Sequence, residues 1–136
     1  MTQLDPRSQT TGSAQSSNSG QRRDLEERTY EFAQAVRTFV KELPKTTGNL
    51  EDVKQLVRSS GSVAANWIEA DESLSKKDFV MRAKICRKEA KESRLFLRLL
   101  EPGGTETSNA QRDKLAAEAR ELTLIFAAIL RRTESK

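Results

Sequence analysis

The sequence contains no histidine among its 136 residues. Histidine is the commonest general base and metal ligand near neutral pH, so Ser-His pairs, Cys-His pairs and the usual transition-metal sites are excluded. The single cysteine, Cys86, cannot form a disulfide within the chain, and an unpaired thiol is typical of a reducing compartment. We therefore expect no enzymatic activity, no catalytic residue, no metal site and no cofactor.

Long apolar runs are also missing. No run approaches the roughly 18 residues that are needed to span a membrane. The N-terminal residues lack the apolar core of a secretory signal. From these two features we expect a soluble, cytoplasmic protein.

Aromatic residues are scarce, at 5% of the chain, while charged residues make up 32% and hydrophobic residues 35%. This composition predicts a lean aliphatic core and suits a small helical domain better than an all-β one. Residues 1–23 are mostly Ser, Thr, Gln and Gly, which bury too little surface to offset the entropy of ordering. We expect a disordered tail over 1–23, one domain over 24–133 and a short C-terminal tail over 134–136.

Four segments of the domain carry apolar residues at helical spacing, each after a residue that could cap a helix. The predicted capping residues are Asp24, Asn49, Ser75 and Ser108. The predicted helices are 25–43, 50–72, 76–101 and 109–132. Because the connections are short, neighbouring helices should be antiparallel, and the expected fold class is all-α, an up-down four-helix bundle.

The second predicted helix contains a run of small residues, "SSGSVAA", from 59 to 65. Gly61 costs about 1 kcal/mol in a helix relative to alanine, so something should compensate for it. Small side chains let another helix approach closely, either inside the bundle or in another subunit. Trp67, about one turn further on, is then an anchor in the core or at a subunit interface.

Polar residues flank the apolar lines of the second and third predicted helices. Partly buried polar groups must be paired, so we expect one structural network between these helices. Its predicted members are Asn66, Glu69, Arg82 and Glu89. The acidic group at positions 69, 71 and 72 has no histidine or second cluster beside it, which favours a solvated helix end over a Mg²⁺ or acid-base site.

The third predicted helix is strongly basic. Between Lys76 and Arg98 there are nine basic and three acidic residues, a net charge of +6. The predicted nucleic-acid-binding residues are Lys84, Arg87, Lys88, Lys91, Arg94 and Arg98. Such a face predicts salt-dependent contacts to phosphates with little reading of sequence. The alternative is a solvated face whose cations pair with Glu89 and Glu92.

The fourth predicted helix is apolar nearly all round between residues 122 and 130, which is more than one buried face requires. This pattern predicts a subunit interface, with deep burial or contact with a membrane surface as the alternatives. The predicted interface residues are Trp67, Leu124, Ile125 and Ile129.

Residues 24–100 also resemble a known family, the four-helix-bundle proteins encoded in intervening sequences of bacterial large-subunit ribosomal RNA genes. The stretches that carry the resemblance are "DLEERTYEFAQAVRTFVKELPKT", "QLVRSSGSVAANWIEADESLSKKDF" and "KICRKEAKESRLFLRLL". The matching positions include Ser62, Ala65, Asn66, Glu69, Ala70, Ser73, Asp78 and Phe79. The resemblance implies a ring-shaped homopentamer and no catalytic residues. It also implies kinship with the accessory variability proteins of diversity-generating retroelements, which bind nucleic acid and a reverse transcriptase.

Together, these features predict a non-enzymatic homo-oligomeric adaptor, pentameric by the resemblance. It would bind the backbone of RNA or DNA through the third predicted helix, and a reverse-transcriptase-like protein is a possible partner. The alternative is an oligomeric scaffold whose basic face meets an acidic or polymerase-like protein, without direct contact to nucleic acid.

Overall fold

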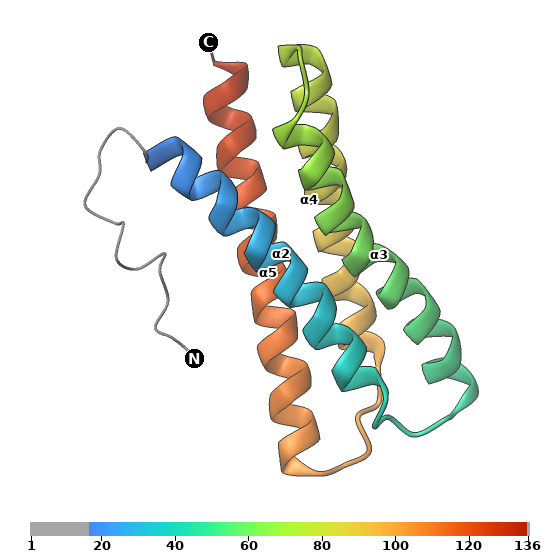
Figure 1. Ribbon diagram of the computed structural model, residues 1–136. Helices are drawn as coiled ribbons and strands as arrows, with labels where there is room; N and C mark the ends of the chain where they lie inside the picture. The colour runs from blue at the N-terminus through green and yellow to red at the C-terminus, as the bar shows by residue number, and fades with distance from the viewer. Residues whose placement is uncertain (1–16, 136) are drawn as a thin grey trace.

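The computed structural model describes the backbone of residues 17–135 and the side chains from residue 24 onward. It contains four helices, which are α2 (Ser17–Val40), α3 (Thr47–Asp71), α4 (Lys76–Leu99) and α5 (Glu106–Glu134), and no strand within residues 17–135 (Figure 1). The predicted all-α four-helix bundle is thus confirmed. Of the tail predicted over 1–23, residues 1–16 lie outside the described part, and residues 17–23 form the start of α2. Of the C-terminal tail, Glu134 belongs to α5 and residue 136 lies outside the described part.

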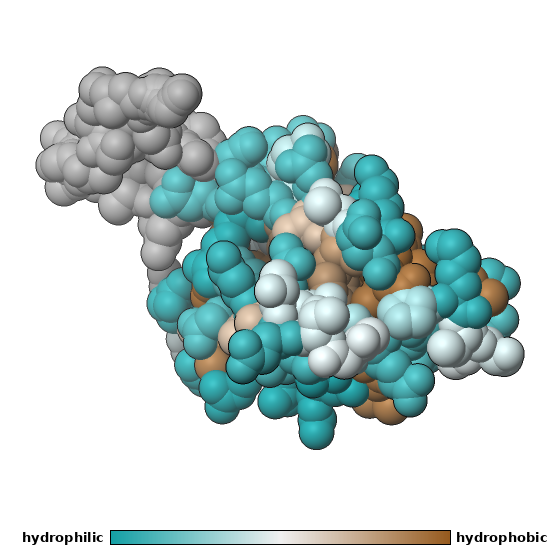
Figure 2. All heavy atoms as spheres, turned by 90° about the horizontal axis from the view of Figure 1, so that it is seen from below, coloured by the Kyte–Doolittle hydropathy of each residue, from teal (hydrophilic) through white to brown (hydrophobic). Residues whose placement is uncertain are grey.

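Consecutive helices run antiparallel. The pairs α3–α4 and α4–α5 pack along most of their lengths, whereas α2 leans across α5 and packs more extensively against α3 (Figure 1). The α2–α3 and α4–α5 connections therefore lie at one end of the bundle, and the α3–α4 turn lies at the other. Seen from the first end, the surface is mostly hydrophilic, with hydrophobic patches between the polar side chains (Figure 2).

The helix starts follow side-chain caps, and only one predicted cap is confirmed. Ser75 accepts a hydrogen bond from the Asp78 amide at 3.1 Å, as its spacing predicts. The caps of α3 and α5 are instead Thr46 and Thr105, each in extended backbone and each accepting from the amide three residues on. The predictions of Asn49 and Ser108 were therefore wrong by three residues. The predicted start at Asp24 was also wrong, because α2 already begins at Ser17.

Asn49 has a different role, as a clamp between two loops. Its Nδ2 donates to the carbonyls of Pro44 and Glu101, both at 2.9 Å, and its Oδ1 accepts from the Glu101 amide at 3.0 Å. The side chain is only 2% exposed. Asn49 thus joins the α2–α3 connection to the chain that leaves α4. That chain then turns at Gly103 and Gly104, whose φ angles of 98° and 84° favour glycine.

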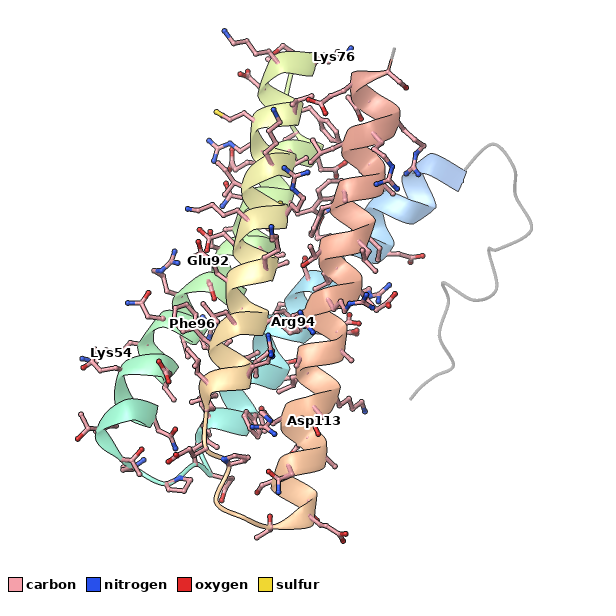
Figure 3. The ribbon with its side chains drawn as sticks, turned by 180° about the vertical axis from the view of Figure 1, so that it is seen from behind. Lys54, Lys76, Glu92, Arg94, Phe96 and Asp113 are labelled. Atoms are coloured by element: carbon pink, nitrogen blue, oxygen red, sulfur yellow. The ribbon has the colours of Figure 1, made fainter. Side chains whose placement is uncertain are left out.

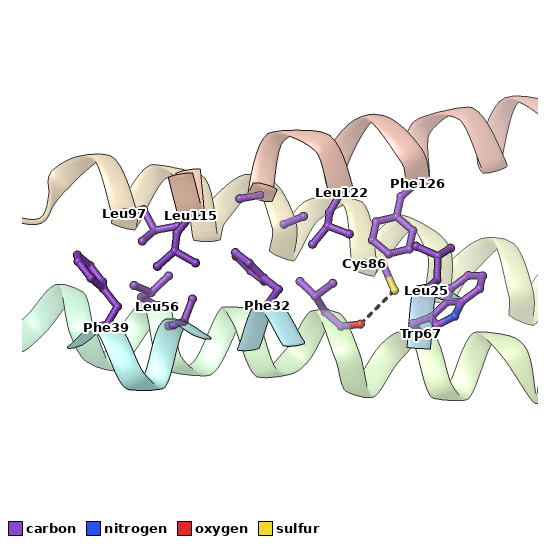
Figure 4. Packing of buried hydrophobic residues seen from close by; sticks show 14 of the residues in the cluster. Leu25, Phe32, Phe39, Leu56, Trp67, Cys86, Leu97, Leu115, Leu122 and Phe126 are labelled. Atoms are coloured by element: carbon purple, nitrogen blue, oxygen red, sulfur yellow. Dashed lines mark hydrogen bonds between the residues drawn. The ribbon is translucent and has the colours of Figure 1, made fainter. Parts of the chain in front are cut away.

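The core is a column of mostly aliphatic side chains that also contains Phe32 and Phe39, with an aromatic group near the α3–α4 turn (Figure 4). Trp67 packs edge-on against Phe79, with ring centroids 6.0 Å apart, and lies 5.8 Å from the ring of Phe126. Trp67 is 2% exposed within a single chain. Of the two positions predicted for Trp67, core or subunit interface, the single chain shows the core, and the indole also lines a hollow beside the α3–α4 turn.

The small residues of α3 face other helices of the same bundle. Ser59 Oγ lies 2.8 Å from Ser93 Oγ of α4, and both side chains are buried. Gly61 lies under the guanidinium of Arg37 from α2, whose Nη2 would be 3.1 Å from a Cβ at this glycine. Close packing inside the bundle accounts for the small side chain of Ser59, whereas the group nearest to Gly61 is the flexible end of Arg37.

Candidate nucleic-acid interface

The four residues of the predicted polar network fall into separate places. Arg82 Nη1 donates to Asn66 Oδ1 at 2.9 Å, and Asn66 Nδ2 donates to the carbonyl and hydroxyl oxygens of Ser62. Glu69 is exposed, and Glu89 lies farther along α4, where it pairs with another residue. The prediction of one network is therefore corrected to a small Arg82–Asn66 cluster and a second cluster of ion pairs around Glu89.

The second cluster is organised by Arg58 of α3, which the sequence analysis did not single out. Its guanidinium contacts Glu89 at 3.1 Å and Glu92 at 3.3 Å, and Lys88 lies 3.8 Å from Glu92. The hydrogen bond to Glu89 raises the pKa of Arg58 above its ordinary value. Glu89 is 6% exposed, so a partner for its charge was to be expected. The antiparallel pairing of α3 with α4 supplies this partner, and helix spacing within one segment could not reveal it.

The six predicted nucleic-acid-binding residues all lie on α4 but differ in their pairing. Lys84 lies 3.5 Å from Glu134, and Lys88 pairs with Glu92. The other four have no ion pair with any residue from 24 to 135. These four cations, the unpaired stripe, are Arg87, Lys91, Arg94 and Arg98. The alternative of a self-neutralised face therefore holds for two of the six residues and does not hold for the stripe.

Helix α5 adds cations that sequence reasoning about α4 alone missed. The contact of Lys84 with Glu134 sets the antiparallel register, which places Arg131 level with Arg87 and Arg120 level with Arg98. Arg120 and Arg131 are about three helical turns apart, so they lie on one side of α5. Both are exposed and have no ion pair within the described residues. Arg94 lies on the side of α4 that faces α5 (Figure 3).

A shallow groove separates α4 and α5 at this level, with a volume of about 240 Å³. Its walls are Lys91 and Arg94 from α4 and Arg120, Thr123 and Leu124 from α5. The groove shows that the basic surface extends over two helices. Two cations at the same level of two antiparallel helices are the signal that could have predicted this extension.

The predicted interface residues do not form one surface. Leu124, 48% exposed, lies in the basic groove. Ile125 and Ile129 are half-buried and line a hollow of about 780 Å³ between α2, α5 and the α3–α4 turn, together with Leu74. Leu74 is 100% exposed. The apolar side chains of α5 thus lie in three places: the core, the groove and this hollow.

The thiol of the only cysteine is unreactive near neutral pH. Cys86 is completely buried, its Sγ donates to the Val63 carbonyl at 3.6 Å, and burial raises its pKa from 9.0 to about 12. A thiol with so high a pKa is a poor nucleophile near neutral pH. Residues 24–135 contain no group of Cys, Asp and Glu side chains that could hold a metal ion. None of the described helices is long and apolar enough to cross a membrane.

Comparison with known proteins places these features in context. The model of the family described as "23S rRNA-intervening sequence protein" matches residues 22–127. A crystal structure from Bacteroides thetaiotaomicron, of a protein with unknown function from the S23 ribosomal protein family, is similar with a TM-score of 0.67 and 27% identity. The similarity covers 78% of this chain and 97% of that chain. No curated protein matches the sequence.

Proposed function

The chain belongs to the 23S rRNA-intervening sequence protein family, and from this premise we propose that it is a non-enzymatic, homo-oligomeric adaptor for nucleic acid. It binds the phosphate backbone of RNA or DNA through the outer face of α4. The observation that carries the proposal is the unpaired stripe of Arg87, Lys91, Arg94 and Arg98.

The pairing of each cation decides what it can contribute. A lysine or arginine that already contacts a carboxylate must give up that contact to neutralise a phosphate, whereas an unpaired cation gains charge compensation directly. The four cations of the stripe extend over about 16 Å of helix. If each neutralises one phosphate, the logarithm of the binding constant should fall with the logarithm of salt concentration with a slope of about −2.8 to −3.6 per chain. Contacts of this kind position the backbone and carry no sequence information.

Homo-oligomerisation belongs to the same proposal. The family resemblance implies a pentamer, and repetition of the stripe around a ring would raise the avidity for a long nucleic acid without any new type of contact. The hollow lined by Ile125, Ile129 and the exposed Leu74 is our candidate for the subunit contact. A reverse-transcriptase-like protein is the proposed protein partner, because the sequence resemblance implies a relation to retroelement accessory proteins.

A binding titration with a charge-reversed variant tests the adaptor. Fluorescent structured RNA and duplex DNA are titrated at low and near-physiological salt with the wild-type chain and with Arg87→Glu/Lys91→Glu/Arg94→Glu. We expect steep salt dependence for the wild type and loss of most binding in the variant, because three of the four unpaired cations are reversed. Light scattering after gel filtration checks that the oligomer is retained.

The matched control reverses three other exposed lysines, Lys41, Lys45 and Lys114, which lie outside α4 and have no ion pair within residues 24–135. It changes the net charge by the same amount, so it separates a local site from overall charge. Equal loss of binding in both variants would contradict a site on α4. Absence of binding by the wild type at low salt would favour the protein-interaction scaffold instead.

A further inference from the structure

We propose that the groove between α4 and α5 is a discrete site for a single backbone phosphate. Lys91 and Arg94 hold the phosphate from one wall, and Arg120 holds it from the other. The proposal deepens the proposed function and rests on it, since it names the group that the basic surface binds at one point. It also assigns a binding residue, Arg120, outside the basic helix.

The groove is large enough for this ligand. Its volume of about 240 Å³ is several times the roughly 30 Å³ that one water molecule takes up in the liquid, so a phosphate group with part of its hydration shell can enter. The side chains come from two antiparallel helices, so a ligand in the groove is contacted from both sides. An exposed stripe on one helix can contact it from one side only.

The charges in the groove have the same sign and lack internal compensation. Lys91, Arg94 and Arg120 have no ion pair with any described residue. The nearest acidic residues along the two helices are engaged elsewhere. Glu92 contacts Arg58 and Lys88, and Glu118 contacts Arg28 at 2.7 Å.

Glu121, next to Arg120 in the chain, comes three residues after Glu118, which contacts Arg28 of α2, so the two acidic residues lie on the same side of α5. Three cations that converge without a carboxylate repel one another. A bound anion would remove this repulsion.

The chemistry of the walls favours a phosphate held by charge. Arginine presents a planar set of N–H donors that can bind two phosphate oxygens at once. Two arginines on opposite walls can therefore bind the same phosphate. The Thr123 hydroxyl donates to the Ala119 carbonyl at 2.8 Å, so its hydrogen is already used. Leu124, on the same wall, has no polar side-chain group, so the three cations supply the charge that meets the phosphate.

The first test compares Arg120→Gln with Lys114→Gln. Both substitutions remove one exposed positive charge from α5, but Lys114 does not line the groove. We expect Arg120→Gln to weaken RNA binding about tenfold at low salt and to reduce the salt slope by about 0.7 to 0.9. Lys114→Gln should bind like the wild type. Equal affinities and slopes in the two variants would overturn the groove site.

The second test observes the groove directly by NMR. The methyl signals of Thr123 and Leu124 are followed during titration with the same RNA and, separately, with inorganic phosphate. The methyl groups of Ile68 and Leu74 serve as distant references. We expect selective shifts of the two groove residues, and smaller shifts in Arg120→Gln.

The outcomes separate the two proposals. RNA binding that leaves Thr123 and Leu124 unshifted would overturn the groove site and leave the adaptor standing. Phosphate-induced shifts without binding of RNA or duplex DNA would overturn the adaptor, and with it the assignment of the bound phosphate to a nucleic-acid backbone. No response to either ligand would overturn both.

Discussion

Replacing Asn49 with aspartate tests whether this side chain clamps two loops or caps a helix. In the structure, Asn49 makes three hydrogen bonds, to the Pro44 carbonyl and to the carbonyl and amide of Glu101, and is 2% exposed. Aspartate has no N–H to donate. It would keep the bond from the Glu101 amide, lose the other two bonds and place a carboxylate against two carbonyl oxygens.

The two roles predict different free energies of unfolding. A net value of about 1 kcal/mol per hydrogen bond gives a loss of about 3 kcal/mol for Asn49→Ala. Asn49→Asp should lose at least as much, because two bonds are lost and a charge is buried beside oxygen acceptors. If Asn49 were the helix cap that its sequence position suggests, aspartate would be an equivalent residue and the loss would be close to zero.

Urea unfolding at pH 7 and a fixed protein concentration measures these differences. Asn109→Asp is the matched control, because Asn109 lies in the first turn of α5 and its side chain makes no hydrogen bond within the described residues. A carboxylate there should be neutral or slightly stabilising. A loss below about 1 kcal/mol for Asn49→Asp would refute the clamp.

Two further predictions concern Gly61 and Cys86. Gly61→Ala should raise the free energy of unfolding by up to about 1 kcal/mol, because alanine favours the helix and the flexible end of Arg37 can move away from the new Cβ. A loss above about 2 kcal/mol in urea unfolding would indicate a rigid contact, such as a second subunit. Cys86 should react with iodoacetamide at pH 8 only after unfolding, because burial raises its pKa from 9.0 to about 12. Since the folded pKa is the higher one, this thiol's contribution to stability should be complete below pH 9.0 and fall toward pH 12, and Cys86→Ala should reduce that fall. Rapid labelling of the native protein, or an unchanged pH profile in Cys86→Ala, would contradict this description of the thiol.

The basic surface could not be described from the sequence alone, because the sequence does not show which of its cations form ion pairs. On the sequence, the six predicted nucleic-acid-binding cations of α4 are equivalent members of one helix face. In the structure, Lys84 and Lys88 have acidic partners, and the remaining four do not. The partner of Lys84 is Glu134, about fifty residues away along the chain, and the groove residue Arg120 is also on α5. The most informative variants are therefore those of the unpaired stripe and of Arg120.

The sequence alone predicts the fold class and the number and approximate positions of the helices, because the apolar spacing of a helix depends only on local geometry. It also determined the basic character of α4 and the cap at Ser75, since both depend on residues within a few turns of one another. Three features are visible only once the helices are packed: which charges are paired, that Trp67 is a core residue and that Asn49 holds two loops together. Each of these depends on contacts between helices that are distant in sequence, and local spacing contains no information about how antiparallel helices are aligned.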